Sequence, residues 1–431
     1  MKGLLIFSSR ISLAFGLKIL NLGFQIVTII LIAKVFTEKE LGIYYLMLSL
    51  FGLQIISDLG FSKTMAIFIS HESGKVKLEN KILKGSKTSL NKINLVFKLV
   101  TNWLKKASLV LFIIYLALGA FFFLYKDNSV ELFKLWIPLA LISSFSIFSP
   151  LIFSFFEGIN NINRANIFIS TQLIVSNVFF LLSINKLGIY SILIKSLGGL
   201  IVLLLYIYHY RKLFKQLINF DGEENQLRNQ FNIQQKKFAL TSITGYFILN
   251  TFVPFSYYFI SSEFSGKLGF SLQIINTLIS FLMIFFLVNY PIISQDIAER
   301  KYHIARSKFY YIIKLILPLY FFGTICFFAI KDNLLSYINS KFLTTNQLIV
   351  LFAGGVFFIL VQLMGSYLRL FKKEFFLKHA FISALLSMTL LSTIGYHYSE
   401  KGVVASYVII TFFQLSYGYL IFKKHLHYET N

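Results

Sequence analysis

Long runs of apolar residues alternate with short polar connections from one end of the chain to the other. A helix of about 20 apolar residues is long enough to cross a bilayer. No small-residue cleavage site follows the first run, so it is expected to stay as a membrane anchor rather than be removed as a signal peptide. Twelve transmembrane helices are predicted, near residues 9–34, 41–62, 107–125, 130–156, 165–185, 188–209, 238–261, 267–290, 308–330, 346–370, 376–396 and 402–422. The pattern predicts an all-α polytopic membrane protein.

The first apolar run carries charges at depths where a charge is costly. On a helix with about 100° between residues, one face collects Arg10, Lys18, Asn21, Gln25 and Thr28, and the other faces are apolar. A helix in lipid turns such a stripe toward other helices or a water-filled cavity. We therefore expect this stripe to line a substrate pathway as a cationic wall. For Arg10 the alternative is a place near the cytoplasmic end, with the guanidinium reaching the headgroups.

A few other polar residues interrupt the apolar runs. Lys195 and Lys314 lie inside the sixth and ninth runs, where a lysine usually faces the protein interior and where each is a candidate for the pathway. Asp58 closes the second run, either as an inner gate or ion-pair partner of Arg10, or as a solvated carboxylate at a helix end. Five amides are expected to line a cavity or to bridge helices: Asn250, Gln273, Asn276, Gln362 and Gln414.

The distribution of lysine and arginine predicts the orientation in the membrane. Of the 41 such residues, 28 fall on the two ends and the even-numbered connections, and 9 fall on the odd-numbered connections. Cytoplasmic loops carry the excess of basic residues, so both termini are expected in the cytoplasm. The net charge of +23 then reflects topology and attraction to anionic membrane lipid. Nucleic-acid binding is not expected, because the charge is scattered over many loops.

The connections suggest two halves. We expect six-helix bundles at residues 1–209 and 238–431, joined by a cytoplasmic linker at 210–237. The long basic segment at 63–106 has apolar residues at helical spacing. It is expected to form an amphipathic helix, starting near Ile82 and Leu83, that lies on the inner membrane face and runs into the third span.

The two halves also resemble each other in sequence. Residues 31–46 match 258–273, each with a short polar turn and a Leu-Gly pair, at an offset of 227. An even number of spans in each half would make the repeat parallel, related by an axis along the membrane normal.

Composition narrows the function. Hydrophobic residues make up 56% of the chain and charged residues 14%. The single cysteine excludes an internal disulfide, no metal-binding cluster or phosphate-binding loop is present, and no cofactor is expected. Carboxylates inside the apolar runs are nearly absent while cations number up to four, so the balance favours an anionic substrate.

The first hairpin also carries a family resemblance. Residues 33–64 contain a polar turn, then Gly-Ile-Tyr at 42–44 and Asp-Leu-Gly at 58–60, and a Gly- and Asn-rich turn follows at 157–166. This pattern resembles the polysaccharide-unit (O-antigen, oligosaccharide-repeat) flippases of the multidrug/oligosaccharidyl-lipid/polysaccharide exporter superfamily. The layout of twelve spans in two bundles is similar over nearly the whole chain. The second-half hairpin departs from the pattern, because Gly269 is followed by Phe270 and Ser271, without a tyrosine.

The resemblance implies a flippase rather than an enzyme. It implies two bundles that alternate between inward-open and outward-open states in the bacterial cytoplasmic membrane. The substrate would be a polyprenyl-pyrophosphate-linked oligosaccharide for surface polysaccharide, with a polysaccharide polymerase as a possible partner. Arg10, Lys18, Lys195 and Lys314 would neutralise its pyrophosphate or acidic sugars, and Asp58 would help the inner gate.

Other functions stay open at this point. An ion-coupled drug or metabolite exporter of the same superfamily would need a buried carboxylate in the first half, and Asp58 is the only candidate. A membrane polymerase or glycosyltransferase normally has a long outer loop with catalytic residues, whereas the outer loops here are short. A lipid II-type flippase usually has two further spans.

Overall fold

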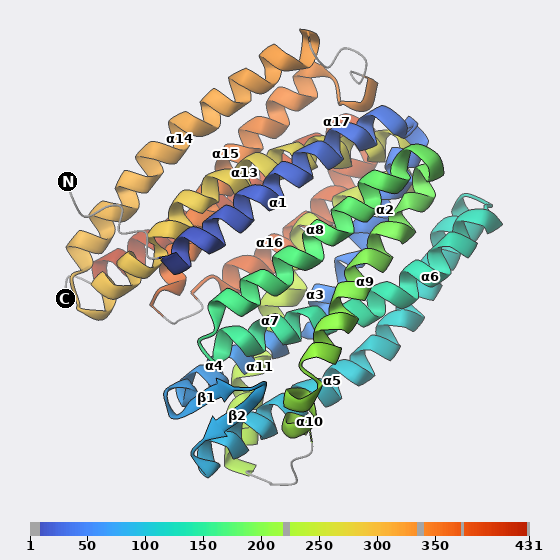
Figure 1. Cartoon of the computed structure of the whole chain (residues 1–431). Helices are drawn as coiled ribbons and strands as arrows, with labels where there is room; N and C mark the ends of the chain where they lie inside the picture. Colours follow the sequence, from blue (N-terminus) through green and yellow to red (C-terminus); the bar gives the residue numbers. More distant parts are fainter. Residues whose placement is uncertain (1–8, 219–224, 334–339, 372–374, 429–431) are drawn as a thin grey trace. The chain divides into compact units, whose positions relative to one another are not determined.

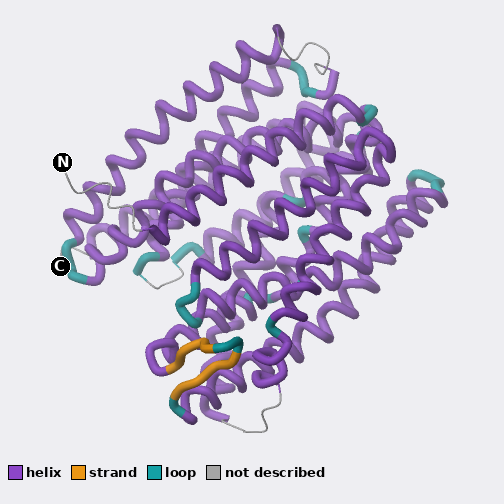
Figure 2. The backbone as a smooth tube through the Cα atoms, viewed as in Figure 1, coloured by secondary structure: helices purple, strands orange, loops and turns teal. Residues whose placement is uncertain are grey.

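The computed structural model describes residues 9–218, 225–333, 340–371 and 375–428 (Figure 1). Arg10 is therefore described only as part of a helix backbone, and the same holds for Lys18, because their side chains lie outside the described part. The described chain is almost entirely helical, with one two-stranded hairpin (Figure 2). This confirms the predicted all-α class, and the hairpin is the one exception among the described residues.

The helices of the first half begin with the two that form the first membrane hairpin. In order they are α1 (Ser9–Val35), α2 (Glu38–Phe51), α3 (Leu53–Asp58), α4 (Phe61–Glu72), α5 (Lys87–Gly119), α6 (Val130–Ser146), α7 (Phe148–Gly158), α8 (Ile162–Leu187), α9 (Ser191–His209) and α10 (Arg211–Ile218). A π-helical turn, Ala120–Lys126, continues α5. The strands β1 (Val76–Glu79) and β2 (Ile82–Gly85) pair antiparallel between α4 and α5.

The second half has fewer and longer helices. They are α11 (Asn225–Leu249), α12 (Phe252–Phe259), α13 (Ser262–Ala298), α14 (Tyr302–Asn333), α15 (Thr345–Arg369), α16 (Leu377–Leu390) and α17 (Tyr396–Tyr428), with a π-helical turn at Leu391–Gly395. Contacts divide the chain into two units. Unit 1 holds residues up to Phe24 and Leu50–Tyr246, and unit 2 holds Gln25–Ser49 and Phe247–Asn431. Much of α1 and most of α2 thus group with the second half.

Eight helical segments of the described chain are long and apolar enough to cross a membrane, and α11 with α12, bent by 41°, gives a ninth. Two of the eight, Ile162–His209 and Leu377–His425, have 48 and 49 residues, about twice the length of one span. In each, the two helices pack against each other, so each segment is a hairpin of two spans. With α1, whose described apolar part is shorter, each of the twelve predicted spans lies on one helix or on consecutive helices separated by a short break.

The two hairpins turn with the same unusual backbone. Gly188 ends α8 with φ +51° and ψ −128°, and Ser399 interrupts α17 with φ +52° and ψ −131°. These angles belong to a position that normally requires glycine. Because equivalent turns of the two halves share them, the repeat is visible in the backbone as well as in the order of helices.

The basic segment after the second span differs from its prediction. Ile82 and Leu83 lie in β2 rather than in a helix, and α5 is continuous from Lys87 into the third span. The apolar stripe of α5 is buried inside unit 1, and large exposed apolar side chains on this helix begin only at Leu109. The predicted helical spacing is therefore confirmed from Lys87 on. The predicted contact of this apolar face with the membrane is wrong, because protein covers it.

Candidate functional site

The polar stripe of α1 faces the protein at Asn21. The amide nitrogen of Asn21 donates a hydrogen bond to the Ser170 hydroxyl on α8, at 3.1 Å. The Asn21 side-chain oxygen and the Thr28 hydroxyl are buried and have no hydrogen-bond partner among the described residues. Gln25 is half-buried on the same helix. Each of these two atoms could bind a polar group, since buried polar atoms without a partner in the described part of the chain are costly.

A second polar seam joins α7, α8 and α9 in unit 1. The Gln172 amide nitrogen on α8 donates to the Ser149 hydroxyl at 2.9 Å and to the Gly199 carbonyl at 3.1 Å. The Lys195 ammonium on α9 lies 4.9 Å from the centre of the Phe180 ring, a cation–π contact. Lys195 is half-buried. The Phe180 ring thus stabilises the Lys195 cation between helices α8 and α9.

The predicted site residues of unit 1 do not form one cluster. Asn21 contacts α8 at Ser170 and Lys195 contacts it at Phe180. Ten residues of α-helix correspond to about 15 Å along the axis. The two candidate positions therefore lie at different depths along α8.

Asp58 is engaged in helix capping. Its carboxylate accepts hydrogen bonds from the hydroxyl of Ser62, at 2.6 Å, and from the amide of Ser62, at 3.3 Å. This stabilises the start of α4 beyond the break at Leu59 and Gly60, both of which have positive φ. The Gln235 amide on α11 donates to the Leu59 carbonyl at 2.9 Å and so fastens the same break.

Lys314 lies on the surface of its own unit. It is exposed on α14 rather than enclosed among the helices of unit 2. A different lysine of this helix, Lys331, is buried at its end and donates to the Thr345 hydroxyl at 3.3 Å. The sequence did not single out Lys331, because it stands at the edge of an apolar run where lysines are ordinary.

A close backbone contact within unit 2 joins α2 and α13. A Cβ atom on Gly266 would lie 2.7 Å from the Gly42 amide nitrogen and 2.9 Å from the Glu38 carbonyl oxygen, and one on Gly42 would overlap the backbone of Ser262. The two helices thus approach backbone to backbone. The contact is reciprocal, because Gly42 meets Ser262 while Gly266 meets Glu38. Such reciprocity is what a two-fold axis between equivalent surfaces produces.

The helix starts agree with this symmetry. Thr37 caps α2, exchanging hydrogen bonds with Glu40, and Ser261 caps α13 by accepting from the Phe264 amide. Thr37 corresponds to Ser261, and Gly42 to Gly266, at an offset of 224 residues rather than 227. The sequence match paired Gly42 with Gly269, so the structure shifts it by one helical turn. Aligning the two sequences from their capping residues, Thr37 and Ser261, would have given the correct offset of 224 residues.

Side chains reinforce the α2–α13 contact. The Lys267 ammonium lies 3.1 Å from the Glu38 carboxylate. The Tyr45 hydroxyl donates a hydrogen bond to the Gln273 side-chain oxygen. Gln273 therefore acts as a bridge between helices, one of the two roles expected for it.

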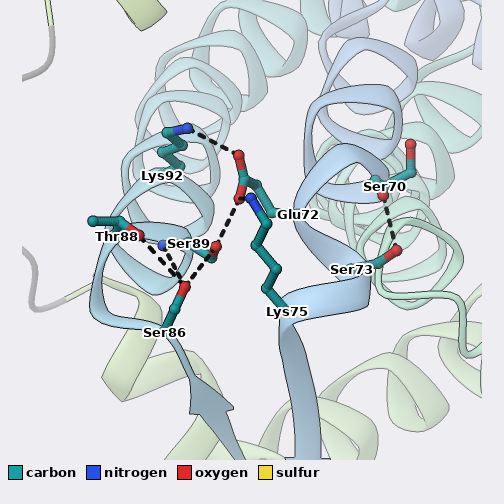
Figure 3. A network of polar contacts seen from close by, with 8 residues as sticks. All are labelled: Ser70, Glu72, Ser73, Lys75, Ser86, Thr88, Ser89 and Lys92. Carbon is teal, nitrogen blue, oxygen red and sulfur yellow. Dashed lines mark hydrogen bonds and ion pairs between the residues drawn. The ribbon is translucent and has the colours of Figure 1, made fainter.

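A polar network ties the ends of α4 and α5 in unit 1 (Figure 3). The Glu72 carboxylate accepts a hydrogen bond from the Ser89 hydroxyl at 2.7 Å and lies 3.0 Å from the Lys92 ammonium. Lys75 approaches it at 4.0 Å. The Ser89 hydrogen bond, followed by Lys92, lowers the pKa of Glu72 although partial burial opposes them. The carboxylate therefore stays ionised and holds the two helices together at the base of the β-hairpin.

Among the described residues, no group of three His, Cys, Asp or Glu side chains could hold a metal ion. No protein-family model matches the chain, and no curated protein matches it in sequence. Solved structures do match in fold. An inward-facing multidrug resistance MATE transporter of the MOP superfamily gives a TM-score of 0.71 at 13% identity over 95% of each chain.

Two further structures show the same architecture. An outward-facing multidrug resistance MATE transporter gives a TM-score of 0.63 at 12% identity, over 98% of this chain and 95% of the other. A MOP superfamily transporter from Pyrococcus furiosus, described by the reverse polarity of its binding pocket, gives 0.63 at 12% identity, over 97% and 94%. These neighbours are transporters rather than enzymes. The chain is therefore a multi-pass membrane protein with the fold of the MATE transporters of the MOP superfamily.

Proposed function

We propose that the protein is a flippase, which moves a polyprenyl-pyrophosphate-linked oligosaccharide across the bacterial cytoplasmic membrane for surface polysaccharide synthesis. The sugar and pyrophosphate would cross inside the protein while the lipid tail stays in the bilayer. Both termini would lie in the cytoplasm, as the lysine and arginine distribution favours. A polysaccharide polymerase would take the unit on the far side.

The observation that carries this proposal is the position of the Lys195 side chain. The Lys195 ammonium is half-buried, four residues after the start of α9 and against Phe180, in an apolar helix where a charge is costly. A pyrophosphate that left water unpaired would pay a large desolvation penalty, and cations along the path offset it. Arg10 and Lys18 would add to this, and Lys314 would contribute from the exposed face of α14.

The carboxylates of the first hairpin also favour an anionic substrate. Asp58 caps α4 and Glu38 pairs with Lys267, so these two anions of the first hairpin are already engaged within the protein. A site for a cationic drug would instead need a free carboxylate facing the pathway. The transported substrate is therefore proposed to be an anion.

The test is a strain that lacks the gene. We expect loss of polymerised surface glycan, with lipid-linked repeat units accumulating on the cytoplasmic leaflet, and recovery when the gene is restored. Leaflet location is measured by access of a non-permeant glycosidase or lectin to inside-out and right-side-out vesicles. Normal glycan together with repeat units on the outer leaflet would reject the flippase.

A second candidate is an ion-coupled exporter of drugs or metabolites. The likeness in fold to multidrug resistance MATE transporters favours it. The same deletion strain separates the two, because an exporter would leave glycan intact and change sensitivity to toxic compounds. Uptake of a cationic dye into everted vesicles, driven by Na⁺ or a proton gradient, would identify that activity directly.

A further inference from the structure

A cationic surface outside the proposed transport path lies where α9 ends. The exposed apolar side chains of α9, which include Leu204, Leu205 and Tyr208, mark a face for lipid. Only three residues after Tyr208, α10 begins with exposed basic residues. The Arg211 guanidinium lies 4.6 Å from the centre of the Tyr208 ring, so the first cation is held at the end of the lipid-exposed face.

The short helix α10 displays its cations outward because its apolar face is used. Leu213, Phe214 and Leu217 are buried in unit 1, and the Phe214 ring lies 5.8 Å from that of Phe97 on α5. Arg211, Lys212 and Lys215 are exposed on the other side. The helix is amphipathic, but protein covers its apolar face and leaves the charged face free.

The β-hairpin is fastened beside α10. The Gln216 side chain exchanges two hydrogen bonds with the Leu83 backbone, at 3.0 and 2.9 Å, as a neighbouring strand would. The Lys81 ammonium lies 3.3 Å from the His209 ring at the end of α9. Figure 1 shows the hairpin and α10 next to each other in unit 1. Six exposed cations and one exposed acid, Glu79, belong to this basic shelf: Lys77, Lys81, Lys84, Arg211, Lys212 and Lys215.

Two features of the hairpin keep positive charge at a cost in stability. Lys77 is directly opposite Lys84 in the antiparallel register, and like charges in such pairs are destabilising, although Glu79 relieves Lys84 at 3.2 Å. Lys81 occupies the turn with φ +62°, after Asn80 at +47°, where glycine is the favoured residue. A purely structural hairpin would not need a lysine at either place.

We propose that this basic shelf binds the headgroups of anionic phospholipids. The shelf continues the lipid-exposed face of α9, its charge is complementary to such headgroups, and clustered cations beside a membrane span attract them. By the distribution of lysine and arginine, the lipid belongs to the inner leaflet. The proposal does not depend on which substrate is transported.

The test uses the purified full chain in a neutral detergent. Short-chain phosphatidylglycerol or phosphatidylcholine is added, and bound lipid is counted by native mass spectrometry. Each cation near an anionic surface contributes about fivefold in affinity. The double variant K212Q/K215Q, and likewise K77Q/K84Q, is therefore expected to bind phosphatidylglycerol about 25-fold more weakly, with phosphatidylcholine unchanged. The matched control is K134Q/K186Q, which removes two exposed cations elsewhere in unit 1 and leaves binding as in the wild type.

The variant K81G separates charge from structure. Glycine relieves the positive-φ turn, so we expect a higher melting temperature together with about fivefold weaker binding of phosphatidylglycerol. Equal binding of the two lipids by the wild type, or unchanged phosphatidylglycerol binding in both double variants, would overturn the proposal. We expect excess detergent to displace the bound phosphatidylglycerol. We expect a hexaglutamate peptide in excess not to displace it. Tight binding of that peptide without any lipid preference would assign the shelf to an acidic protein segment instead.

Discussion

Gly266 lies against the backbone of Gly42, with space for a hydrogen atom but not for a methyl group. The substitutions G42A and G266A should each destabilise the protein by about 1–3 kcal/mol, because two helix backbones cannot easily move apart. Thermal unfolding in detergent measures this loss. Gly23 is the control, since a Cβ atom there meets nothing within 4 Å and alanine favours a helix. Equal melting temperatures for G42A and G23A would show that the contact between α2 and α13 has room for a methyl group.

The shared turn geometry of Gly188 and Ser399 gives a second prediction. Ser399 adopts with a side chain the conformation that Gly188 adopts without one. The substitution S399G should stabilise the protein by about 1 kcal/mol and G188S should destabilise it by a similar amount or more. The melting temperature of each variant is compared with that of the wild type. The two substitutions are the reverse of each other at equivalent positions. A loss of stability in S399G would mean that the serine hydroxyl contributes more than the turn costs.

The sequence predicted the fold well because membrane helices leave a strong signal. All twelve apolar runs became helices, since a backbone in lipid must satisfy its hydrogen bonds within the segment. The β-hairpin was missed because Ile82 and Leu83, between lysines, fit a helical period as well as a strand. Short apolar runs do not distinguish the two. The strand is instead determined by the pairing of β1 with β2 and by the two hydrogen bonds between the Leu83 backbone and the side chain of Gln216, which is distant in sequence.

The candidate site was predicted in part only. Helical phase placed Asn21 on the inward stripe, and its contact with Ser170 agrees with that expectation. The depth at which each side chain meets its neighbours depends on how helices pack, so the separation of Asn21 from Lys195 along α8 was not visible. For the same reason the sequence suggested an inner-gate or solvated role for Asp58 and missed its cap on Ser62. The stripe residues as substrate ligands stay a prediction.

Lys195 is the position at which a cation in the pathway is most directly tested. The substitution K195M keeps length and removes the charge, so we expect surface glycan to fall by about tenfold or more, as for loss of one charged hydrogen bond. K195R should retain most activity because the charge remains over Phe180. Lys18→Ala is expected to impair glycan in the same direction. K134Q, at an exposed position of α6, is the control, and protein amount in the membrane is measured for each variant. Equal glycan in K195M and K134Q would remove Lys195 from the pathway.

The ion pair of Glu38 and Lys267 is expected to contribute little by itself. Both side chains are 30% exposed, and ion pairs with such access to water contribute about 0.2–1 kcal/mol. A double-mutant cycle with E38Q and K267M should therefore give a coupling energy in that range. A coupling well above 1 kcal/mol would indicate that the pair is shielded from water and fastens the two repeats together.

Glu72 should make stability depend on pH at the base of the hairpin. Its pKa is lowered by the Ser89 hydrogen bond and then by Lys92, so the folded state binds its proton less readily than the unfolded state does. The stabilisation is complete above the unfolded pKa of about 4.3 and is lost as the pH falls through the lower folded pKa. The carboxylate is 12% exposed, and hydrogen bonds to a charged group contribute about 1.5–3 kcal/mol. E72Q should therefore be less stable than the wild type at pH 7 by about that amount, with the difference shrinking toward pH 3.

The control E79Q removes a carboxylate that is 53% exposed and should change stability by less than about 0.5 kcal/mol at either pH. Denaturant unfolding in detergent at pH 7, 5 and 3 measures both variants. A difference between E72Q and the wild type that stays constant over this range would show that Glu72 acts through its shape and not through its charge.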